Sequence, residues 1–243
     1  MKRRIWFVLL AAALFLPGSL AAQEVSFSLG DDGSVSARTI QLFALITVLS
    51  LAPGIAIMVT CFPFMITVLS ILRQAIGLQQ SPPNMLIVSL ALFLTYFIME
   101  PVFTQAWANG ISPLTNNEIG IETAFERTIE PFRVFMAARL DPETFFAMAE
   151  LRPDTIDEVP DENAALSVLV PSFLLSEISR AFQVGFLIFL PFLIIDLVVA
   201  AVLMSMGMMM VPPAIVSLPF KLAFFVLADG WSLIAGSLVK SYF

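Results

Sequence analysis

Three charged residues inside long apolar runs are the first candidates for chemistry in this sequence. Asp196 is the only charge in residues 181–220, and Lys221 and Asp229 follow it in the next apolar run. Charges in such places usually have partners or line water. If the chain turns at Pro212–Pro213, Asp196 is level with Asp229. The two carboxylates then repel each other unless one is protonated or Lys221 of another chain intervenes. The pattern predicts a proton relay or, as the preferred interpretation, pairing between helices or subunits.

The sequence offers little other material for catalysis or metal binding. It contains no histidine, which excludes histidine-based triads and metal sites. The single cysteine, Cys61, lies in an apolar stretch without an obvious base, which favours an inert buried thiol over a nucleophile. No glycine-rich phosphate loop followed by Lys-Ser or Lys-Thr occurs. We therefore expect no enzymatic activity and no cofactor. Glu177 and Arg180 lie just before the second long apolar run, and we expect them, like Asp196, to pair with charges on other helices or subunits.

A methionine-rich segment is the most unusual feature of the sequence. Five of the seven residues in Met204–Met210 are methionine, namely Met204, Met206, Met208, Met209 and Met210, and the turn Pro212–Pro213 follows. Methionine is unbranched and polarizable, so a ring of these side chains closes around varied surfaces and reopens readily. Gap filling between helices is the simpler interpretation. The density of methionine at a Gly-Pro bend favours a deformable seal.

The composition indicates a membrane protein or a subunit of a large assembly. The chain is 59% hydrophobic and 13% charged, with a mean hydropathy of +0.93. The net charge is -7, and residues 100–180 hold 14 acidic residues against five arginines. This stretch reads as a solvated acidic face, and it argues against nucleic-acid binding, which needs clustered Lys and Arg.

The N-terminus has the pattern of a secretory signal peptide. Residues 1–22 begin with Lys and Arg, continue with a short apolar core and end in small residues, with cleavage expected after Ala21 or Ala22. An uncleaved anchor helix is the alternative. A short periplasmic tail, residues 23–38, is expected to follow, with Gly30–Gly33 as its turn.

Two hydrophobic hairpins are predicted to flank a small helical region, which makes the chain an all-α membrane protein with about four membrane-type helices. Residues 39–72 carry no charge and would form a helix of about 51 Å, too long for a bilayer core of about 30 Å. We therefore expect kinks or breaks near Pro53 and Pro63. The turn at Pro82–Pro83 ends the first arm, and the first hairpin spans residues 39–99.

Residues 100–180 are predicted to form an acidic helical region on the periplasmic side. Thr123 and Glu126 have the spacing of a capping box, and Asp141-Pro142-Glu143 is typical of a helix start. Residues 152–163 read as a loop. The second hairpin is predicted to span residues 181–243, with the methionine-rich turn and Pro212–Pro213 between its arms.

Six sequence runs resemble the FliP family of flagellar type III export gate proteins. The similarity covers about residues 40–243, and its runs are LSILRQAIG at 69–77, QQSPPN at 79–84, FLPFLIIDLV at 189–198, MGMMMVPP at 206–213, SLPFK at 217–221 and DGW at 229–231.

The resemblance implies a core pore-forming subunit of the export gate in the bacterial inner membrane at the flagellar basal body. In that family further FliP copies form a ring with FliQ and FliR, next to FlhB, and unfolded flagellar subunits pass through it. The methionine-rich segment of the family forms the pore constriction, which maps here to Met206, Met208, Met209 and Met210. The chain departs from the family at Pro63-Phe64, where a threonine and a basic residue are usual.

Three alternatives stay open at this point. The nearest is the paralogous gate subunit of a virulence-type injectisome, against which the signal peptide argues. An ion or small-solute transporter would use Asp196 and Asp229 as a coupled pair. An intramembrane enzyme would need a nucleophile with a base, or metal ligands, and the sequence offers neither.

Overall fold

A computed structural model describes residues 34–78, 82–208 and 210–243, and every regular element in these ranges is helical. This confirms the predicted all-α fold. The predicted signal peptide and the turn at Gly30–Gly33 lie outside the described residues. The chain divides into two compact units, Met1–Ser50 and Leu51–Phe243. Within the first, the structure describes the beginning of α2, whose apolar side chains, such as Ile40, Phe43 and Leu49, are exposed.

The first apolar run is broken as the sequence predicts, but at only one of the two prolines. α2 (Ser34–Met58) contains Pro53 without ending there, and α3 (Phe62–Ile76) begins after a short break. Pro63 lies in the first turn of α3, where its missing N–H leaves no backbone acceptor unsatisfied. The break at residues 59–61 therefore comes where a proline can start the next helix.

The return arm of the first hairpin is longer than its apolar stretch. α4 (Asn84–Ala106) runs through Glu100 and Pro101 and continues into a π-helical turn, η1 (Trp107–Ile111), and a short helix, α5 (Ser112–Thr115). The predicted boundary after Met99 thus lies inside a helix, because one exposed carboxylate does not interrupt the backbone hydrogen bonds.

Two further helices, α6 and α7, lie in the middle of the acidic region. α6 (Ile121–Arg139) starts after Gly120, so Thr123 lies within its first turn and the predicted capping box is wrong. α7 (Pro142–Ala149) starts as predicted: the Asp141 carboxylate accepts a hydrogen bond of 3.0 Å from the Thr144 N–H. Residues 150–165 form turns and loop, as expected.

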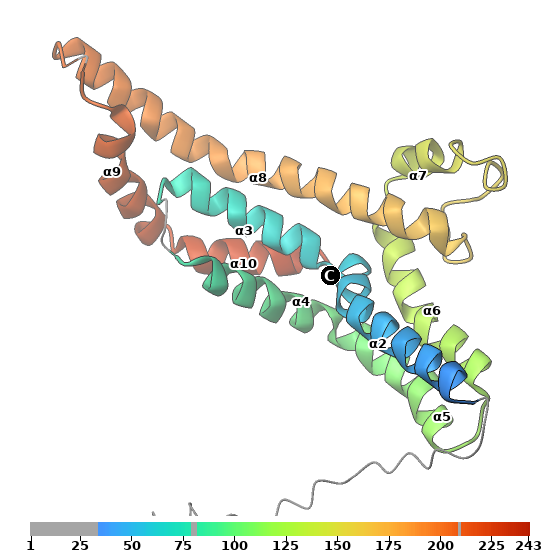
Figure 1. Ribbon diagram of the computed structural model, residues 1–243. Helices are drawn as coiled ribbons and strands as arrows, with labels where there is room; N and C mark the ends of the chain where they lie inside the picture. The colour runs from blue at the N-terminus through green and yellow to red at the C-terminus, as the bar shows by residue number, and fades with distance from the viewer. Residues whose placement is uncertain (1–33, 79–81, 209) are drawn as a thin grey trace, which may run out of the picture. The chain divides into compact units, whose positions relative to one another are not determined.

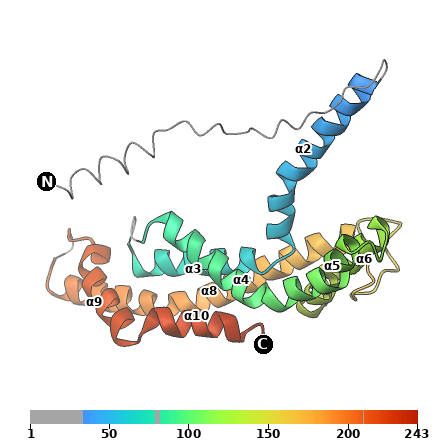
Figure 2. The ribbon, with the colours of Figure 1, turned by 90° about the horizontal axis from the view of Figure 1, so that it is seen from below.

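α8 (Leu166–Ser205) is the longest helix described, with 40 residues and a length of about 60 Å. It continues through Arg180, where the sequence placed a boundary. α9 (Pro213–Leu227) and α10 (Gly230–Lys240) follow and are bent by 61° at their break. Figure 2 shows α9 at one end of α8 and α6 at the other.

α8 joins two hydrophobic cores within residues 51–243. One core lies between α3, α4 and α8 with parts of α9 and α10, and the other joins α6 and α7 to the start of α8. α3 packs between α8 and α4 (Figure 1). The contact is close at Gly185, because a Cβ there would lie 2.4 Å from the Ile71 side chain.

Much of the apolar surface stays unburied in the single chain. Among the described residues, α8 and the segment Asn84–Thr115 are each long and apolar enough to cross a membrane, and the number rises to four if each of two broken helix pairs counts as one span. Only 11% of the most apolar part of α8 is buried within the chain. Lipid or other protein must cover the remainder.

Candidate functional site

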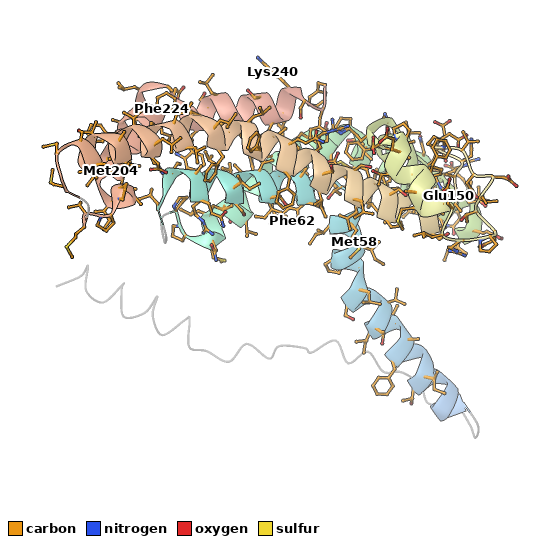
Figure 3. The ribbon with its side chains drawn as sticks, turned by 90° about the horizontal axis from the view of Figure 1, so that it is seen from above. Met58, Phe62, Glu150, Met204, Phe224 and Lys240 are labelled. Atoms are coloured by element: carbon orange, nitrogen blue, oxygen red, sulfur yellow. The ribbon has the colours of Figure 1, made fainter. Side chains whose placement is uncertain are left out.

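The methionine-rich segment lies at the C-terminal end of α8 and in the turn that leads to α9. Figure 3 shows Met204 at one end of the group of helices that contains α8 and Glu150 at the other end. Gly207 adopts a left-handed conformation with φ of 77°, and its N–H donates to the Met204 carbonyl at 3.1 Å. The Met208 N–H donates to the Leu203 carbonyl at 3.0 Å. This pair of bonds is a Schellman cap, so the methionines project from a defined helix end.

The described methionines of this segment are not core side chains in the single chain. Met204, Met206, Met208 and Met210 are all exposed, whereas Met65, Met99 and Met136 are buried. Met206 and Met208 also line an apolar cavity of about 620 Å³ between α8 and α9, together with Val202, Val216 and Phe220. Met209 lies outside the described residues. Exposed thioethers beside an apolar cavity fit a surface that closes on something outside this chain.

A cluster around Lys221 joins α3, α8 and α9, and we call it the Lys221 cluster: Asp196, Ser217, Lys221 and the Ala75 carbonyl. Lys221 Nζ donates to Asp196 Oδ2 at 2.6 Å and to the Ala75 carbonyl at 3.1 Å. Ser217 Oγ donates to the other oxygen, Oδ1, at 2.5 Å. Ala75 lies in the last turn of α3, where carbonyls lack helical partners and attract cations. One lysine thus caps a helix and neutralises a carboxylate.

The geometry differs from the predicted alignment of Asp196 with Asp229. Lys221 of the same chain pairs with Asp196, and Asp229 is exposed at the break between α9 and α10. The described residues between α8 and α9, 206–208 and 210–212, do not continue the helix, which shifts the second arm along the first. Asp196 therefore faces residues one and two turns into α9. Within the described ranges, Asp229 forms no ion pair.

A second cluster surrounds the fully buried Glu177, and we call it the Glu177 cluster: Arg139, Glu177, Arg180, Tyr242 and the Ser241 carbonyl. Glu177 Oε1 lies 3.1 Å from Arg139 Nε and 3.8 Å from Arg180 Nη1. Tyr242 donates its hydroxyl hydrogen to Glu177 Oε2. Arg139 Nη1 donates to the Ser241 carbonyl at 2.7 Å, so the end of the chain is held against α6 and α8.

Tyr242 completes the packing of this cluster. Its ring lies 3.9 Å from the Arg139 guanidinium carbon and stacks on Phe135. Burial, reinforced by the Glu177 carboxylate, raises the pKa of Tyr242 well above its usual range. The phenol therefore stays protonated and remains a hydrogen-bond donor. Arg139 Nη2 is buried without a hydrogen-bond partner among the described residues.

Phe64 stands where the family resemblance leads us to expect a basic residue. Its side chain is fully buried and lies edge-on to the Tyr242 ring, with centroids 5.7 Å apart. Phe64 contributes an aromatic contact there, and the cations that approach Glu177 among the described residues are Arg139 and Arg180.

Sequence reasoning singled out Glu177, Arg180, Asp196 and Lys221 but missed Arg139, Tyr242 and Ser217. A weak signal existed for Tyr242, because the chain contains only two tyrosines.

Both Pro-Pro pairs lead directly into helices: Pro83 and Pro212 are the N-cap residues of α4 and α9, and Pro213 is the first residue of α9. Within the described residues no group of three or more Cys, Asp or Glu is placed to hold a metal ion.

Long apolar helices, joined by the ion pairs of the Glu177 and Lys221 clusters, define an all-helical membrane protein. A sequence profile of the FliP family matches residues 45–238. The chain is 49% identical to the flagellar biosynthetic protein FliP of Agrobacterium fabrum over 243 aligned residues, which cover 98% of each chain. It is 52% identical to that of Rhizobium meliloti, over 87% of this chain and 86% of the relative. It is 46% identical to FliP of Bacillus subtilis, over 89% of this chain and 97% of the relative. The chain belongs to the FliP family.

Proposed function

We propose that this chain is a core pore-forming subunit of the flagellar type III protein export gate in the bacterial inner membrane, through which unfolded flagellar subunits pass. Membership of the FliP family supports this function, since the relatives are flagellar biosynthetic proteins. The gate is a passage rather than an enzyme, and no cofactor takes part.

We propose that neighbouring protein covers most of the unburied apolar surface. A helix of about 60 Å is twice as long as the hydrocarbon core of about 30 Å. A ring of copies of this chain with FliQ and FliR, next to FlhB, would bury what a bilayer cannot, with lipid around it. In this arrangement residues 1–22 are a signal peptide, residues 23–38 and the acidic residues 100–180 face the periplasm, and the hairpins of residues 39–99 and 181–243 build the gate.

The exposed methionine end of α8 is the observation that carries the pore assignment. We assign the constriction to Met206, Met208, Met209 and Met210. Flexible thioether side chains contributed by several copies would close the resting pore against water and ions and yield to a passing chain. In each copy, the Schellman cap fixes where the turn between α8 and α9 starts, and Pro212 fixes where it ends.

A transporter that uses Asp196 and Asp229 as a coupled pair is less well supported. Asp196 is held by Lys221 and Ser217, and Asp229 lies at a helix break. Purified protein in liposomes would separate the two functions, because a transporter catalyses solute uptake alone and a gate subunit does not.

The seal is tested by replacing Met208, Met209 and Met210 together with Ala. Loss of side-chain volume should open the resting pore, so that cells take up a small membrane-impermeant dye faster than the parent. The matched control replaces the same three residues with Leu, which keeps apolar bulk and should leak less than the Ala variant. Cells with the Ala variant that stay as tight as the parent would refute the seal.

A further inference from the structure

The described methionines of this chain range from fully buried to almost fully exposed, and Met58, Met85 and Met204 are exposed at 45%, 79% and 59%. Met65, Met99 and Met136 are 0% exposed, whereas Met206, Met208 and Met210 are 64%, 39% and 98% exposed. The exposed three lie within five residues of one another at the end of α8. A small oxidant that reaches the end of α8 therefore meets three exposed thioethers within five residues, whereas the thioethers of the core are kept from it.

Thioether sulfur reacts with oxidants of the peroxide class by oxygen transfer. The sulfur lone pair attacks a peroxide oxygen, an S–O bond forms and the O–O bond breaks. The sulfur loses two electrons, the peroxide is reduced to water, and the product is methionine sulfoxide. The reaction changes an apolar, flexible side chain into a polar one, and sulfoxide reductases with a thiol reverse it.

The surroundings of Met206 and Met208 make this change consequential. Both side chains line the apolar cavity between α8 and α9, whose other walls include Val216 and Phe220. A sulfoxide oxygen placed there would lack hydrogen-bond donors from these walls, so it would be driven out toward water. Met210 has almost no packing to lose and would react first.

We propose that Met206, Met208 and Met210 form an oxidant-sensitive modification site, at which peroxide-class oxidants convert the thioethers of the seal to sulfoxides and loosen the resting gate. The effect on the seal rests on the proposed function, whereas the oxidation of these residues ahead of Met65, Met99 and Met136 rests on exposure. The modification couples the tightness of the gate to oxidative stress and is reversible by sulfoxide reduction.

The chemistry is tested by adding hydrogen peroxide to membranes that contain the assembled protein and following each methionine by peptide mass spectrometry. Within the cluster, Met210 should gain oxygen before Met206 and Met208. Met65, Met99 and Met136 should react roughly tenfold or more slowly, because burial keeps the oxidant from the sulfur. Equal rates for the exposed and buried groups would overturn the site.

The effect on the gate is tested in two strains that both carry Met209→Leu. One keeps the other three methionines, and the second also carries Met206→Leu, Met208→Leu and Met210→Leu. Peroxide should raise dye uptake above the untreated level only in the first strain, and recovery should require sulfoxide reductase. If peroxide leaves the first strain unchanged while the Ala variant of the seal leaks, the oxidation inference fails and the seal stands. If the Ala variant is tight as well, the proposed function of the segment fails.

Discussion

The Glu177 cluster and the Lys221 cluster lie on the same helix, α8, yet they differ in how much water they meet. Glu177 is fully buried, and the groups around it come from α6, α8 and the end of the chain. Asp196 is 32% exposed, with one lysine and one serine as partners. The first cluster resembles a closed structural joint. In the second cluster Asp196 stays partly open to solvent although Lys221 and Ser217 are buried, and the cluster lies close to the methionine-rich segment.

This difference indicates where the molecule is rigid and where it yields. A buried carboxylate without water depends wholly on its protein partners, so its helices must stay in place. A partly exposed carboxylate can exchange a protein partner for water at lower cost. The end of α8 that carries the methionines is therefore held by the weaker of the two joints.

Glu177→Ala should have the largest effect on stability. It leaves the Arg139 guanidinium buried without its carboxylate and should lower the free energy of unfolding by about 3–5 kcal/mol. The measurement is denaturant unfolding of the purified protein in detergent, followed by tryptophan fluorescence. Glu177→Gln is the matched control and should lose less, because its amide oxygen still accepts from Tyr242. An Ala variant as stable as the parent would contradict the structural role of this joint.

Lys221→Met should cost less than Glu177→Ala in the same assay. The substitution removes two hydrogen bonds, but water can reach Asp196, so a loss of about 1.5–3 kcal/mol is expected. Asp196→Asn is the paired control, because it leaves the Lys221 bond to the Ala75 carbonyl intact and should cost less than Lys221→Met. A loss larger than that of Glu177→Ala would reverse the proposed order of the two clusters.

Asp141, which caps α7 near the Glu177 cluster, should give the smallest effect, visible only in acid. Hydrogen bonds from the Thr144 hydroxyl and N–H lower the pKa of Asp141 below its ordinary value of 3.8. A lowered folded-state pKa contributes stability that is present above the unfolded value and is lost as the pH falls through the folded one.

The stability difference between the parent and Asp141→Asn should thus be constant from about pH 7 to about pH 5 and shrink below about pH 4. Unfolding titrations across this range measure it, with Asp157→Asn in the neighbouring loop as a charge-matched control. A difference that does not change with pH would show that the carboxylate charge plays no part in the cap.

The sequence was sufficient for the helical class and for the turn positions, because apolar run length and Pro-Pro pairs are local signals. The sequence did not indicate which residues pair with the charged side chains. Arg139 lies 38 residues from Glu177, and Tyr242 lies 65 residues away. No periodicity links such distant positions, so only the packing of α6, α8 and α10 reveals the joint.

The predicted start of the second hairpin at residue 181 does not coincide with the start of a helix, for a related reason. Glu177 and Arg180 read as the polar mouth of a hairpin, yet α8 begins at Leu166 and runs through both. Charges end an apolar run, but they do not end a helix when partners from other elements neutralise them. The predicted alignment of Asp196 with Asp229 likewise assumed helices up to the turn, and the described residues 206–208 and 210–212 are not helical.

The central proposal, that methionine segments of several copies meet around one passage, is tested most directly by disulfide cross-linking. In a Cys61→Ala background, Met208→Cys should form disulfide-linked dimers of this chain in membranes on mild oxidation, because facing copies bring the introduced thiols together. Met136→Cys, placed in the buried core, is the matched control and should stay monomeric. Dimers with Met208→Cys alone are the predicted result. Monomers with both variants, in membranes where the assembled protein is present, would contradict it.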